Sequence, residues 1–311
     1  MTVMLASPPK GGHSDNAALA AQLTDTGDWT FEPKYDGVRC LLAVRGRGTM
    51  GSPRSFTIKT RTGGAVTHCF PEMKEVSERL RVGVYDGEMI SGGNGGDFSS
   101  VSGRIHMSPE RALSDFESHQ VRFLAFDMLS QDGLDMRKLP HYQRSDVLLD
   151  CTETLDHPWF HPVMPHADGR MLWQIAEDNN LEGLIAKQRN SAYFAGRSPQ
   201  WLKLKRLRSA SLAVVGWEEG EGHRAGRVGA LKLAAVDGED VVLVGKVGTG
   251  FTDADLATFM DDYISKDRYF VVEVEYQSFT RGGRLRFPSF KGIRHDKSWR
   301  DCSIAQLREG I

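Results

Sequence analysis

The stretch that most restricts the fold is Glu32-Pro33-Lys34-Tyr35-Asp36-Gly37-Val38-Arg39. It follows a predicted strand and places a lysine, an aspartate, a glycine and an arginine in one tight turn. Lys34 is the most informative residue, because an amine attacks phosphorus only when deprotonated, and a nearby metal or other cations favour that neutral form. Asp36 is a candidate for orienting a reacting group, and Gly37 lets the backbone turn. A surface lysine–aspartate pair at a β-turn would have the same sequence, so other segments must decide.

The pattern of apolar residues around this stretch predicts a mixture of strands and helices. Alternating apolar and β-branched residues predict strands at 30–32, 39–44, 55–60, 83–90, 121–129, 183–188 and 201–205. Helical spacing predicts helices at 71–80, 142–150 and 170–179, and Ser108 followed by Pro109 indicates a helix start. The glycine-rich stretch 91–96 lacks a following Gly-Lys-Ser/Thr, which predicts a mobile surface loop and no P-loop.

After Arg208 the sequence changes to short apolar runs separated by turns. These runs lie at 212–217, 230–236, 241–247 and 269–276, with a helix near 253–264, and they predict a small β-barrel. Their number and length suit an OB-like domain, although other small barrels would give the same pattern. We expect a boundary near 207–211, giving domains 1–208 and 209–311. The length of 311 residues, with 40% hydrophobic residues, suits two modest domains.

Composition excludes several classes of protein. The chain shows neither a signal-peptide pattern nor an apolar run approaching ~18 residues, so we expect a cytoplasmic protein without a membrane partner. Its four cysteines form no Cys-x-x-Cys pair, which argues against a zinc site and a disulfide framework. The net charge of −2 gives no overall basic signal. Positive residues nevertheless cluster in two stretches, which are a candidate phosphate surface or two solvated loops: Lys203, Lys205, Arg206 and Arg208, and Arg281, Arg284, Arg286, Lys291, Arg294 and Lys297.

Charged residues on the predicted strands suit phosphate chemistry. Glu88 and Glu182 are carboxylates that could hold a ribose hydroxyl and a hard divalent cation, or simply be exposed strand-end glutamates. A face of alternating lysines could neutralise phosphates as pyrophosphate leaves, or be a solvated strand face; these lysines are Lys187, Lys203 and Lys205. Phe126 lies in an apolar strand and, from the sequence alone, is a core residue.

Residues 32–39 resemble motif I of the covalent nucleotidyltransferase superfamily, which contains DNA ligases, RNA ligases and mRNA capping enzymes. The other motifs of that superfamily have counterparts in the same order: Lys59-Thr60-Arg61-Thr62-Gly63 is similar to motif Ia, Tyr85-Asp86-Gly87-Glu88 to motif III, Leu124-Ala125-Phe126-Asp127 to motif IIIa, Glu182-Gly183-Leu184-Ile185-Ala186-Lys187 to motif IV, Trp201-Leu202-Lys203-Leu204-Lys205 to motif V, and Arg294-His295-Asp296-Lys297 to motif VI. The resemblance covers nearly the whole chain. It implies an α+β nucleotidyltransferase domain, with ATP-grasp-like antiparallel sheets and helices, followed by a C-terminal OB-fold β-barrel.

The residues of these motifs most closely resemble those of ATP-dependent DNA ligases. The resemblance implies that Lys34 takes AMP from ATP, that AMP passes to the 5′-phosphate of a nick, and that the 3′-hydroxyl then displaces it. The implied catalytic residues are Lys34, Asp36, Lys203 and Lys205. The implied nucleotide-binding residues are Glu32, Arg39, Arg61, Glu88, Phe126, Glu182, Lys187, Arg294, Asp296 and Lys297. Glu88 and Glu182 would also bind Mg²⁺ or Mn²⁺.

Some of these residues inherit more specific roles from the resemblance. Phe126 would stack on adenine, Glu32 would contact its amino group, and Arg61 would contact the nucleotide or the DNA end. Motif VI would orient pyrophosphate in the first step and then turn away, so that the barrel can clasp DNA.

The resemblance also bears on cofactor, partner and source. NAD-dependent relatives carry a nicotinamide-recognising region before the lysine and a four-cysteine zinc site, whereas only about thirty residues precede Lys34 here, fewer than a domain needs. We therefore expect ATP. We also expect the minimal two-domain layout of small bacterial and bacteriophage ligases, acting as a monomer on nicked double-stranded DNA in replication, repair or recombination.

Two alternatives remain at this point. An RNA ligase or capping-type nucleotidyltransferase would use the same lysine, although the motif wording favours DNA ligases. A catalytically inactive module that binds DNA ends would keep the fold, but it would be expected to have lost Lys34, Glu88 or Lys203, and all three are present.

Overall fold

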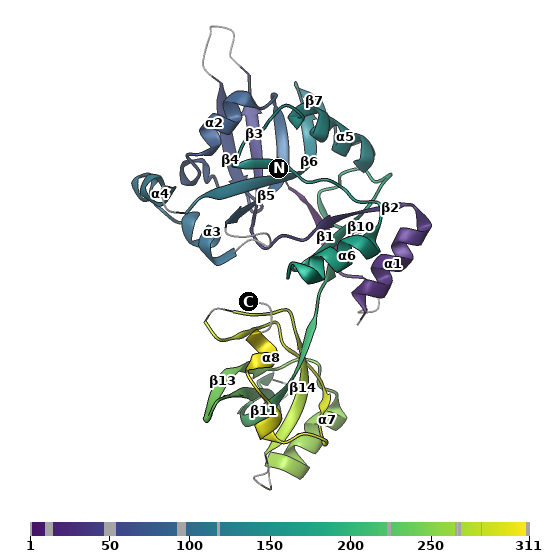
Figure 1. Cartoon of the computed structure of the whole chain (residues 1–311), viewed down its shortest axis with the longest axis vertical. Coiled ribbons are helices and arrows are strands. Elements are labelled where there is room, and N and C mark those ends of the chain that lie inside the picture. The colour runs from purple at the N-terminus through teal and green to yellow at the C-terminus, as the bar shows by residue number, and fades with distance from the viewer. Residues whose placement is uncertain are drawn as a thin grey trace. The chain divides into compact units, whose positions relative to one another are not determined.

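The computed structural model describes residues 2–9, 15–46, 54–91, 98–116, 119–222, 225–264, 266, 269–280 and 282–308. The chain folds into two compact units, Met1–Lys205 and Arg206–Ile311, which are described separately below (Figure 1). This division lies slightly before the one placed at 208/209 from the sequence. Arg281, and the predicted loop 91–96 beyond Ser91, lie outside the described residues.

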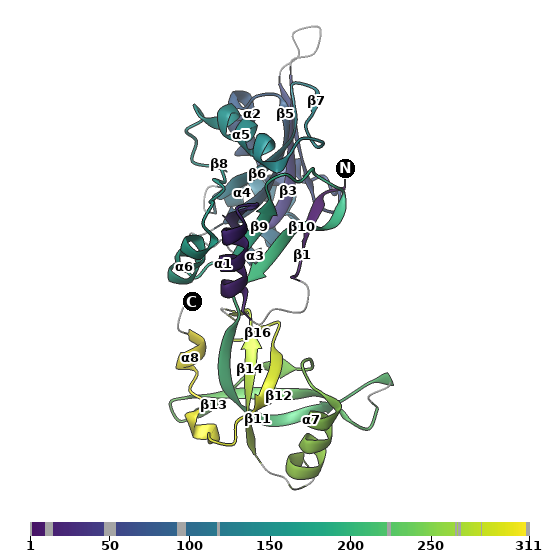
Figure 2. The same cartoon turned by 90° about the vertical axis from the view of Figure 1, so that its right-hand side faces the viewer.

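The N-terminal unit contains a mainly antiparallel sheet in the order β4-β3-β5-β6-β7, with β8 paired in parallel to β6. Its strands are β3 (Val38–Arg45), β4 (Ser55–Thr60), β5 (Gly83–Ser91), β6 (Val121–Gln131), β7 (Leu134–Asp135) and β8 (Phe160–Pro162). Figure 2 shows two helices on one side of this sheet, α2 (Met73–Arg79) and α5 (His141–Thr152). Their apolar residues join the core beneath the sheet, which includes Leu42, Met73 and Leu148. The unit also contains α3 (Phe98–Arg104) and α4 (Pro109–Phe116).

A second sheet of the N-terminal unit has the order β1-β10-β9-β2. Its strands are β1 (Met4–Ser7), β2 (Trp29–Pro33), β9 (Gly183–Gln188) and β10 (Gly196–Lys205), and only β1 runs parallel to its neighbour. Two helices pack on it through one apolar cluster, α1 (Asn16–Thr26) and α6 (Gly169–Asp178). Asp168 caps α6 by accepting the backbone N–H groups of Arg170 and Met171, as expected for an N-cap aspartate.

The C-terminal unit is built on a five-stranded antiparallel sheet in the order β13-β12-β11-β14-β17. These strands are β11 (Arg208–Glu219), β12 (Val228–Asp237), β13 (Asp240–Val247), β14 (Phe270–Tyr276) and β17 (Ser289–Ile293). Register shifts in β11 and β12 mark β-bulges, which bend the sheet around its core. The smaller elements are α7 (Asp253–Thr258) continued by a π-helix (Phe259–Ile264), the hairpin of β15 (Ser278–Phe279) and β16 (Leu285–Arg286), a 3₁₀ turn (Trp299–Asp301) and α8 (Ala305–Arg308). The predicted OB-fold domain is confirmed.

Three elements that position the site were not predicted. They are β1, α1 and α3. In addition, β10 begins at Gly196 rather than at 201. The helix predicted at 253–264 changes to π-helical geometry at Phe259. Within the described part of the chain, no helix combines the length and the apolar character needed to cross a bilayer.

Candidate active site

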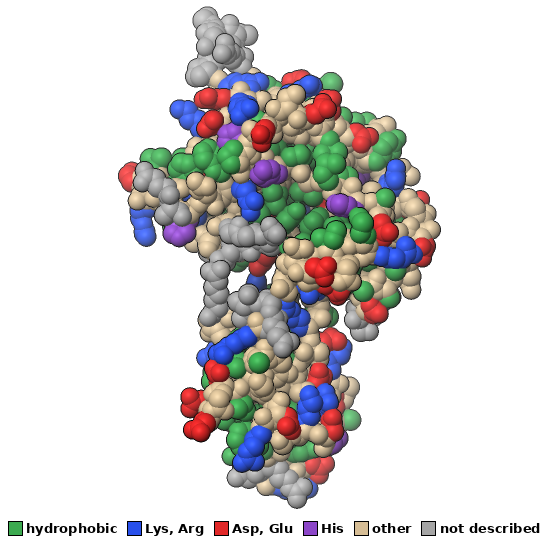
Figure 3. All heavy atoms as spheres, viewed as in Figure 1, with side chains coloured by type: hydrophobic (Ala, Val, Ile, Leu, Met, Phe, Trp, Pro, Cys, Tyr) green, Lys and Arg blue, Asp and Glu red, His purple; other side chains and the backbone are tan. Residues whose placement is uncertain are grey.

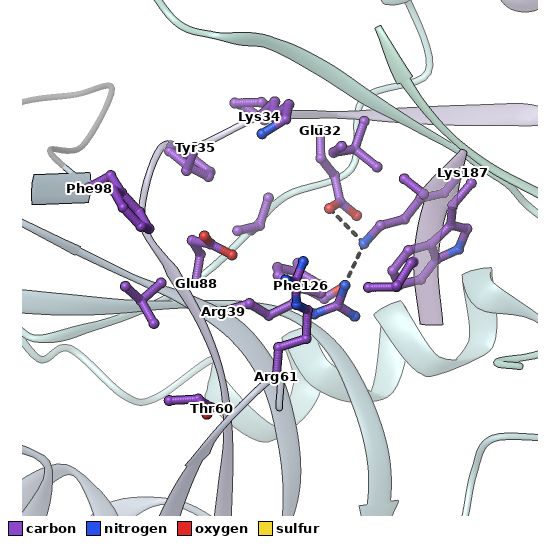
Figure 4. Close-up of a pocket in the computed structure, with 18 of the residues that line it drawn as sticks. Glu32, Lys34, Tyr35, Arg39, Thr60, Arg61, Glu88, Phe98, Phe126 and Lys187 are labelled. Carbon is purple, nitrogen blue, oxygen red and sulfur yellow. Dashed lines mark hydrogen bonds and ion pairs between the residues drawn. The ribbon is translucent and has the colours of Figure 1, made fainter. Parts of the chain in front are cut away.

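A cavity of about 420 Å³ in the N-terminal unit is lined by residues from both sheets (Figure 4). This volume lies within the range of about 300–1,000 Å³ typical of small-molecule sites. Seven of the residues predicted to act on the nucleotide line it: Glu32, Lys34, Arg39, Arg61, Glu88, Phe126 and Lys187. The apolar part of the lining includes Val38, Val163, Ile185 and Trp201. The two sheets therefore bring residues from five of the quoted motifs to one cavity, and from a sixth through Trp201.

Lys34 follows directly after β2, and both its backbone and its side chain make close contacts. Its backbone N–H donates to the carbonyl of Gly183 at 2.8 Å. Its Nζ lies 2.5 Å from Oε2 of Glu182, and the other oxygen of Glu182 lies 3.2 Å from Nζ of Lys205. The side chain of Lys34 is 21% exposed, so its amine does not point into open solvent. The predicted nucleophile therefore lies against an acidic residue of motif IV and beside a lysine of motif V.

Gly37 allows the turn after Lys34 to lie against β5. A Cβ atom at this position would be 2.3 Å from the backbone oxygen of Met89 and 2.8 Å from Cγ2 of Ile90. Both contacts are far shorter than real Cβ contacts, and the first is to backbone that cannot easily move. Glycine at this position thus keeps the turn that carries Lys34 next to the strand that carries Glu88.

Glu88 lies on β5 and pairs across the sheet with Arg39 on β3. Withdrawal from water raises the pKa of its carboxyl group from 4.5 to about 7, although the positive charges of Lys34 and Arg39 act in the opposite direction. The negative charges of Asp86 and Glu182 add to the increase. Near neutral pH this carboxyl is therefore poised between its protonated and ionised forms.

The raised pKa of Glu88 leads to a prediction about stability and pH. Below about pH 4.5 the carboxyl is protonated in the folded and unfolded chain alike. Between pH 4.5 and about 7 the unfolded chain releases this proton more readily, so the contribution of Glu88 to the free energy of unfolding is lost as the pH rises. Glu88→Gln does not titrate, so the variant should gain stability relative to the unmodified protein across this window. Denaturant unfolding of both proteins at pH 5 and pH 8 measures the difference.

A control for this measurement is Glu78→Gln, because Glu78 is an exposed helix residue. The gap in stability between the unmodified protein and this control should stay nearly constant with pH. If Glu88→Gln behaves in the same way as Glu78→Gln, the interpretation of Glu88 as a carboxyl withdrawn from water is wrong.

Arg39 is fixed by a buried carboxylate. Its Nε and Nη2 donate to the two oxygens of Asp86 at 3.0 and 2.7 Å, and Asp86 is fully buried. The guanidinium carbon lies 5.1 Å from the centre of the Phe126 ring and 5.7 Å from that of Trp201. Such a two-pronged pair fixes the plane of the guanidinium group as well as its position. Arg39 is thereby held in the cavity wall beside the aromatic ring predicted to stack on the base.

A buried ion pair lies in the same cavity wall. Nζ of Lys187 is 2.7 Å from Oε2 of Glu32 and donates to the carbonyl of Phe126 at 3.0 Å. Figure 4 shows the amine of Lys187 pointing toward Glu32. Burial raises the pKa of Glu32 from 4.5 to about 7, and the charge of Lys187 limits this increase. The cavity thus presents a carboxyl group and an aromatic ring, the two groups predicted to meet the adenine base.

Four predicted residues of the N-terminal unit do not line the cavity: Asp36, Glu182, Lys203 and Lys205. Glu182 contacts Lys34 and Lys205, as described above. Lys203 lies two residues before Lys205 on β10, and burial together with the charges of Lys205, Arg197 and Lys34 lowers its pKa. Asp36 is not among the residues that line the cavity. Its predicted role stays a prediction.

The residues of motif VI belong to the C-terminal unit and form a cluster there. Nη1 of Arg294 lies 3.0 Å from Glu273, and its Nε and Nη2 donate to Asp296. Lys297 donates to the hydroxyl of Ser211 at 3.0 Å. Basic and acidic side chains are interspersed over the face of this unit drawn in Figure 3. The basic stretch seen in the sequence is therefore partly neutralised within its own domain.

Sequence reasoning missed several residues of the site. Asp86 and Trp201 lie inside the strings that resemble motifs III and V, so the motifs themselves contained the signal. Leu5 and Ala6 also line the cavity. Their strand has four residues and pairs with β10 nearly two hundred positions away, so the local sequence gave no indication of their place.

Comparison with known proteins identifies the family. A family model described as "ATP dependent DNA ligase domain" matches residues 4–205, and a second, "ATP dependent DNA ligase C terminal region", matches residues 224–297. The chain therefore belongs to the ATP-dependent DNA ligase family.

Individual relatives agree with this assignment. The chain is 29% identical over 300 residues to the multifunctional non-homologous end joining protein LigD of Mycolicibacterium smegmatis, covering 87% of this chain and 36% of that protein. It is 30% identical over 328 residues to a DNA ligase of Thermococcus fumicolans, covering 95% and 57%. The chain thus spans between about a third and three fifths of these two relatives. The crystal structure of the ligase domain of LigD from M. tuberculosis has the same fold, with a TM-score of 0.56 at 24% identity over 97% of both chains.

Proposed function

We propose that this chain is an ATP-dependent DNA ligase that seals nicks in duplex DNA through AMP carried on Lys34. The observation that carries the proposal is the position of the Lys34 amine, at the edge of a nucleotide-sized cavity and 2.5 Å from the carboxylate of Glu182. Membership of the ligase family and the names of the relatives support the choice of DNA as substrate.

The cavity fits ATP as the first substrate. The planar base would lie against Phe126, between apolar residues such as Ile185 and Val38. Its amino group would meet the carboxyl of Glu32, whose second oxygen pairs with Lys187. Arg39 and Arg61 provide positive charge in the same cavity, where sugar and phosphate oxygens would follow the base. This arrangement directs the α-phosphate toward Lys34.

In the first step Nζ of Lys34 attacks the α-phosphorus of ATP. A nitrogen–phosphorus bond forms, the bond to pyrophosphate breaks, and the amine gives up a proton. Oε2 of Glu182, at 2.5 Å, is placed to accept that proton. Lys203 and Lys205 lie on the strand beside it and would neutralise charge as pyrophosphate leaves. Asp36 would help to orient the reacting groups.

The two later steps use the same site. An oxygen of the 5′-phosphate of the nick attacks the phosphorus of lysyl-AMP, the nitrogen–phosphorus bond breaks as Nζ takes back a proton from Glu182, and AMP is left on the DNA end. The adjacent 3′-hydroxyl then attacks that 5′-phosphate, loses its proton, and AMP leaves as the new phosphodiester bond forms. Each step is an in-line displacement, so positioning and charge neutralisation provide most of the catalysis.

Two carboxylates, Glu88 and Glu182, are the groups that would hold Mg²⁺ or Mn²⁺. The described residues contain no set of three or more His, Cys, Asp or Glu side chains arranged around a metal position. Two carboxylates nevertheless suit Mg²⁺, which keeps several waters and takes its remaining ligands from substrate phosphates. A metal bound there would supply positive charge at the reacting phosphate.

The C-terminal unit would provide the remaining contacts. Arg294, Asp296 and Lys297 would orient pyrophosphate in the first step, and the barrel would then contact the duplex. We further propose that one chain acts alone in the cytoplasm, where it meets ATP and DNA, and serves repair, replication or recombination. The name of the LigD relatives, which refers to end joining, favours repair among these roles.

Intact-mass measurement of the purified protein tests the proposal. Incubation with ATP and Mg²⁺ should add the mass of one AMP, and either pyrophosphate or nicked duplex DNA should remove it. Parallel incubations with GTP, and with a nick in duplex RNA, test the capping-type and RNA-ligase alternatives. An absent adduct, or an adduct that nicked DNA does not discharge, would exclude this function.

A further inference from the structure

Tyr193 lies outside the strings that resemble family motifs, yet its hydroxyl connects two walls of the cavity. The hydroxyl donates to Oδ2 of Asp86 at 2.6 Å. It accepts the backbone N–H of Met4 at 3.0 Å and a more distant N–H from Nη2 of Arg39 at 3.4 Å. These three groups are far apart in the sequence, and Tyr193 itself is 6% exposed. One phenol oxygen therefore joins the segments that carry β1, β3 and β5.

The three connected segments contribute to the cavity, directly or through a neighbour. Asp86 holds Arg39, which lines the cavity beside Phe126. Met4 begins β1, whose next two residues, Leu5 and Ala6, also line it. The aromatic ring of Tyr193 packs at 5.8 Å against Trp201, a further residue of the lining. The hydroxyl thus contacts both the Arg39–Asp86 pair on one side of the cavity and the backbone at the start of β1 on another side.

The donor and acceptor pattern shows what the hydroxyl does. Asp86 is fully buried, and Arg39 and Tyr193 both donate to its carboxylate. Burial and the charge of Asp86 raise the pKa of the Tyr193 phenol, so the group keeps its proton at neutral pH and remains a donor. Removing the oxygen would leave Asp86 with one donor fewer and would leave the buried N–H of Met4 without this acceptor.

We propose that Tyr193 is a positioning residue for the nucleotide, and that its hydroxyl sets the place of the Arg39 guanidinium and of strand β1 around the bound ATP. The proposal rests on the function proposed above, because it takes ATP as the ligand of this cavity. Tyr193 is not expected to touch the reacting atoms. Its effect should therefore appear in ATP binding, with little change in the rate of lysine adenylylation at saturating ATP.

The test compares two tyrosine-to-phenylalanine variants that each lose one buried hydroxyl. Tyr193→Phe removes the connection described above. Tyr85→Phe is the matched control, since Tyr85 lies on β5 next to Asp86, is fully buried, and donates to the carbonyl of Arg81 at 2.9 Å rather than to a group of the cavity. Both variants keep the aromatic ring, so both should fold with a similar small loss of thermal stability.

Two measurements separate binding from chemistry. The dissociation constant for ATP is measured by equilibrium dialysis in a Lys34→Ala background, where no covalent adduct forms. KM and kcat for AMP transfer are measured with Lys34 present. Tyr193→Phe should raise the dissociation constant and KM about tenfold, as loss of a hydrogen bond to a charged group predicts, with kcat within about twofold. Tyr85→Phe should leave all three values within about twofold of the parent protein.

A second variant ties the effect to the same arginine. Asp86→Asn keeps the shape of the carboxylate but weakens its hold on Arg39, so it should also raise the dissociation constant. Because both changes act through one group, Tyr193→Phe combined with Asp86→Asn should bind ATP about as weakly as the weaker single variant. If the fold-change in the dissociation constant of the double variant equals the product of the two single fold-changes, the two residues act independently, and this result overturns the proposal.

The outcomes also separate this inference from the proposed function. Unchanged ATP binding in Tyr193→Phe, or an equal loss of binding in Tyr85→Phe, overturns the positioning role while leaving the ligase assignment intact. Failure of the protein with Lys34 to take up AMP overturns the ligase assignment, whereas the dialysis measurement still decides whether Tyr193 shapes the cavity for ATP.

Discussion

Replacing Lys34 with alanine is expected to abolish labelling of the protein by α-labelled ATP and to reduce sealing of a 5′-phosphorylated nick by at least about a thousandfold, as removal of a catalytic nucleophile does in other enzymes. The reason is that the amine of Lys34 lies 2.5 Å from Glu182 at the cavity, whereas that of Lys205 lies farther from the same carboxylate, at 3.2 Å. Gel detection of the labelled protein and a nick-sealing assay measure the two effects.

A matched control and a bypass substrate make this result specific. Lys74→Ala removes an exposed lysine of α2 and should label and seal like the unmodified protein. Lys34→Ala should still seal a nick whose 5′-phosphate already carries AMP, because that last step does not use the lysine as nucleophile. Undiminished label in Lys34→Ala would show that another residue carries the nucleotide.

Loss of the buried charge pair between Asp127 and Arg144 is expected to be the largest effect on stability. Both side chains are completely buried, and Nε and Nη2 of Arg144 donate to the two oxygens of Asp127 at 2.7 and 2.8 Å. Arg144 also donates to the carbonyls of Leu139 and Ser191. Asp127→Ala leaves this guanidinium charged without its carboxylate, which should lower the free energy of unfolding by about 3–5 kcal/mol. Denaturant unfolding followed by tryptophan fluorescence measures it.

The double variant Asp127→Leu with Arg144→Met serves as the control. It removes both charges and fills the space with apolar groups, so it should recover much of the stability that Asp127→Ala loses. The single variants Asp127→Leu and Arg144→Met are measured as well. If the double variant loses more free energy of unfolding than the sum of the losses in these two single variants, the cost arises from packing and not from an unpaired charge.

The sequence predicted best those strands in which alternating apolar residues occur together with residues of a family motif. β4 and β9 begin and end at the predicted residues, and both carry motif residues at or beside their ends. Six predicted nucleotide-binding residues and Lys34 line one cavity, because the motif strings that carry them lie on or directly beside strands of the two sheets. The OB-fold domain followed from four short strand patterns, and β17 was missed because basic residues surround its five-residue span.

What the sequence did not predict depends on long-range pairing. The contact of Lys34 with Glu182 joins residues 148 positions apart, and that of Met4 with Tyr193 joins residues 189 positions apart. No local pattern encodes such pairs, because they exist only after the sheets have formed. The pKa of Glu88 is a similar case, since withdrawal from water is a property of the folded cavity.

The anchoring of Lys34 by the carbonyl of Gly183 has a consequence for the order in which the substrates arrive. In the proposed function, AMP bonded to Nζ of this lysine would be held covalently on a residue whose backbone is anchored, so it would not diffuse away after pyrophosphate departs. Activation and joining can then be separated in time. The protein would reach a broken strand already loaded, and the local supply of ATP at that moment would not limit the repair of a single break.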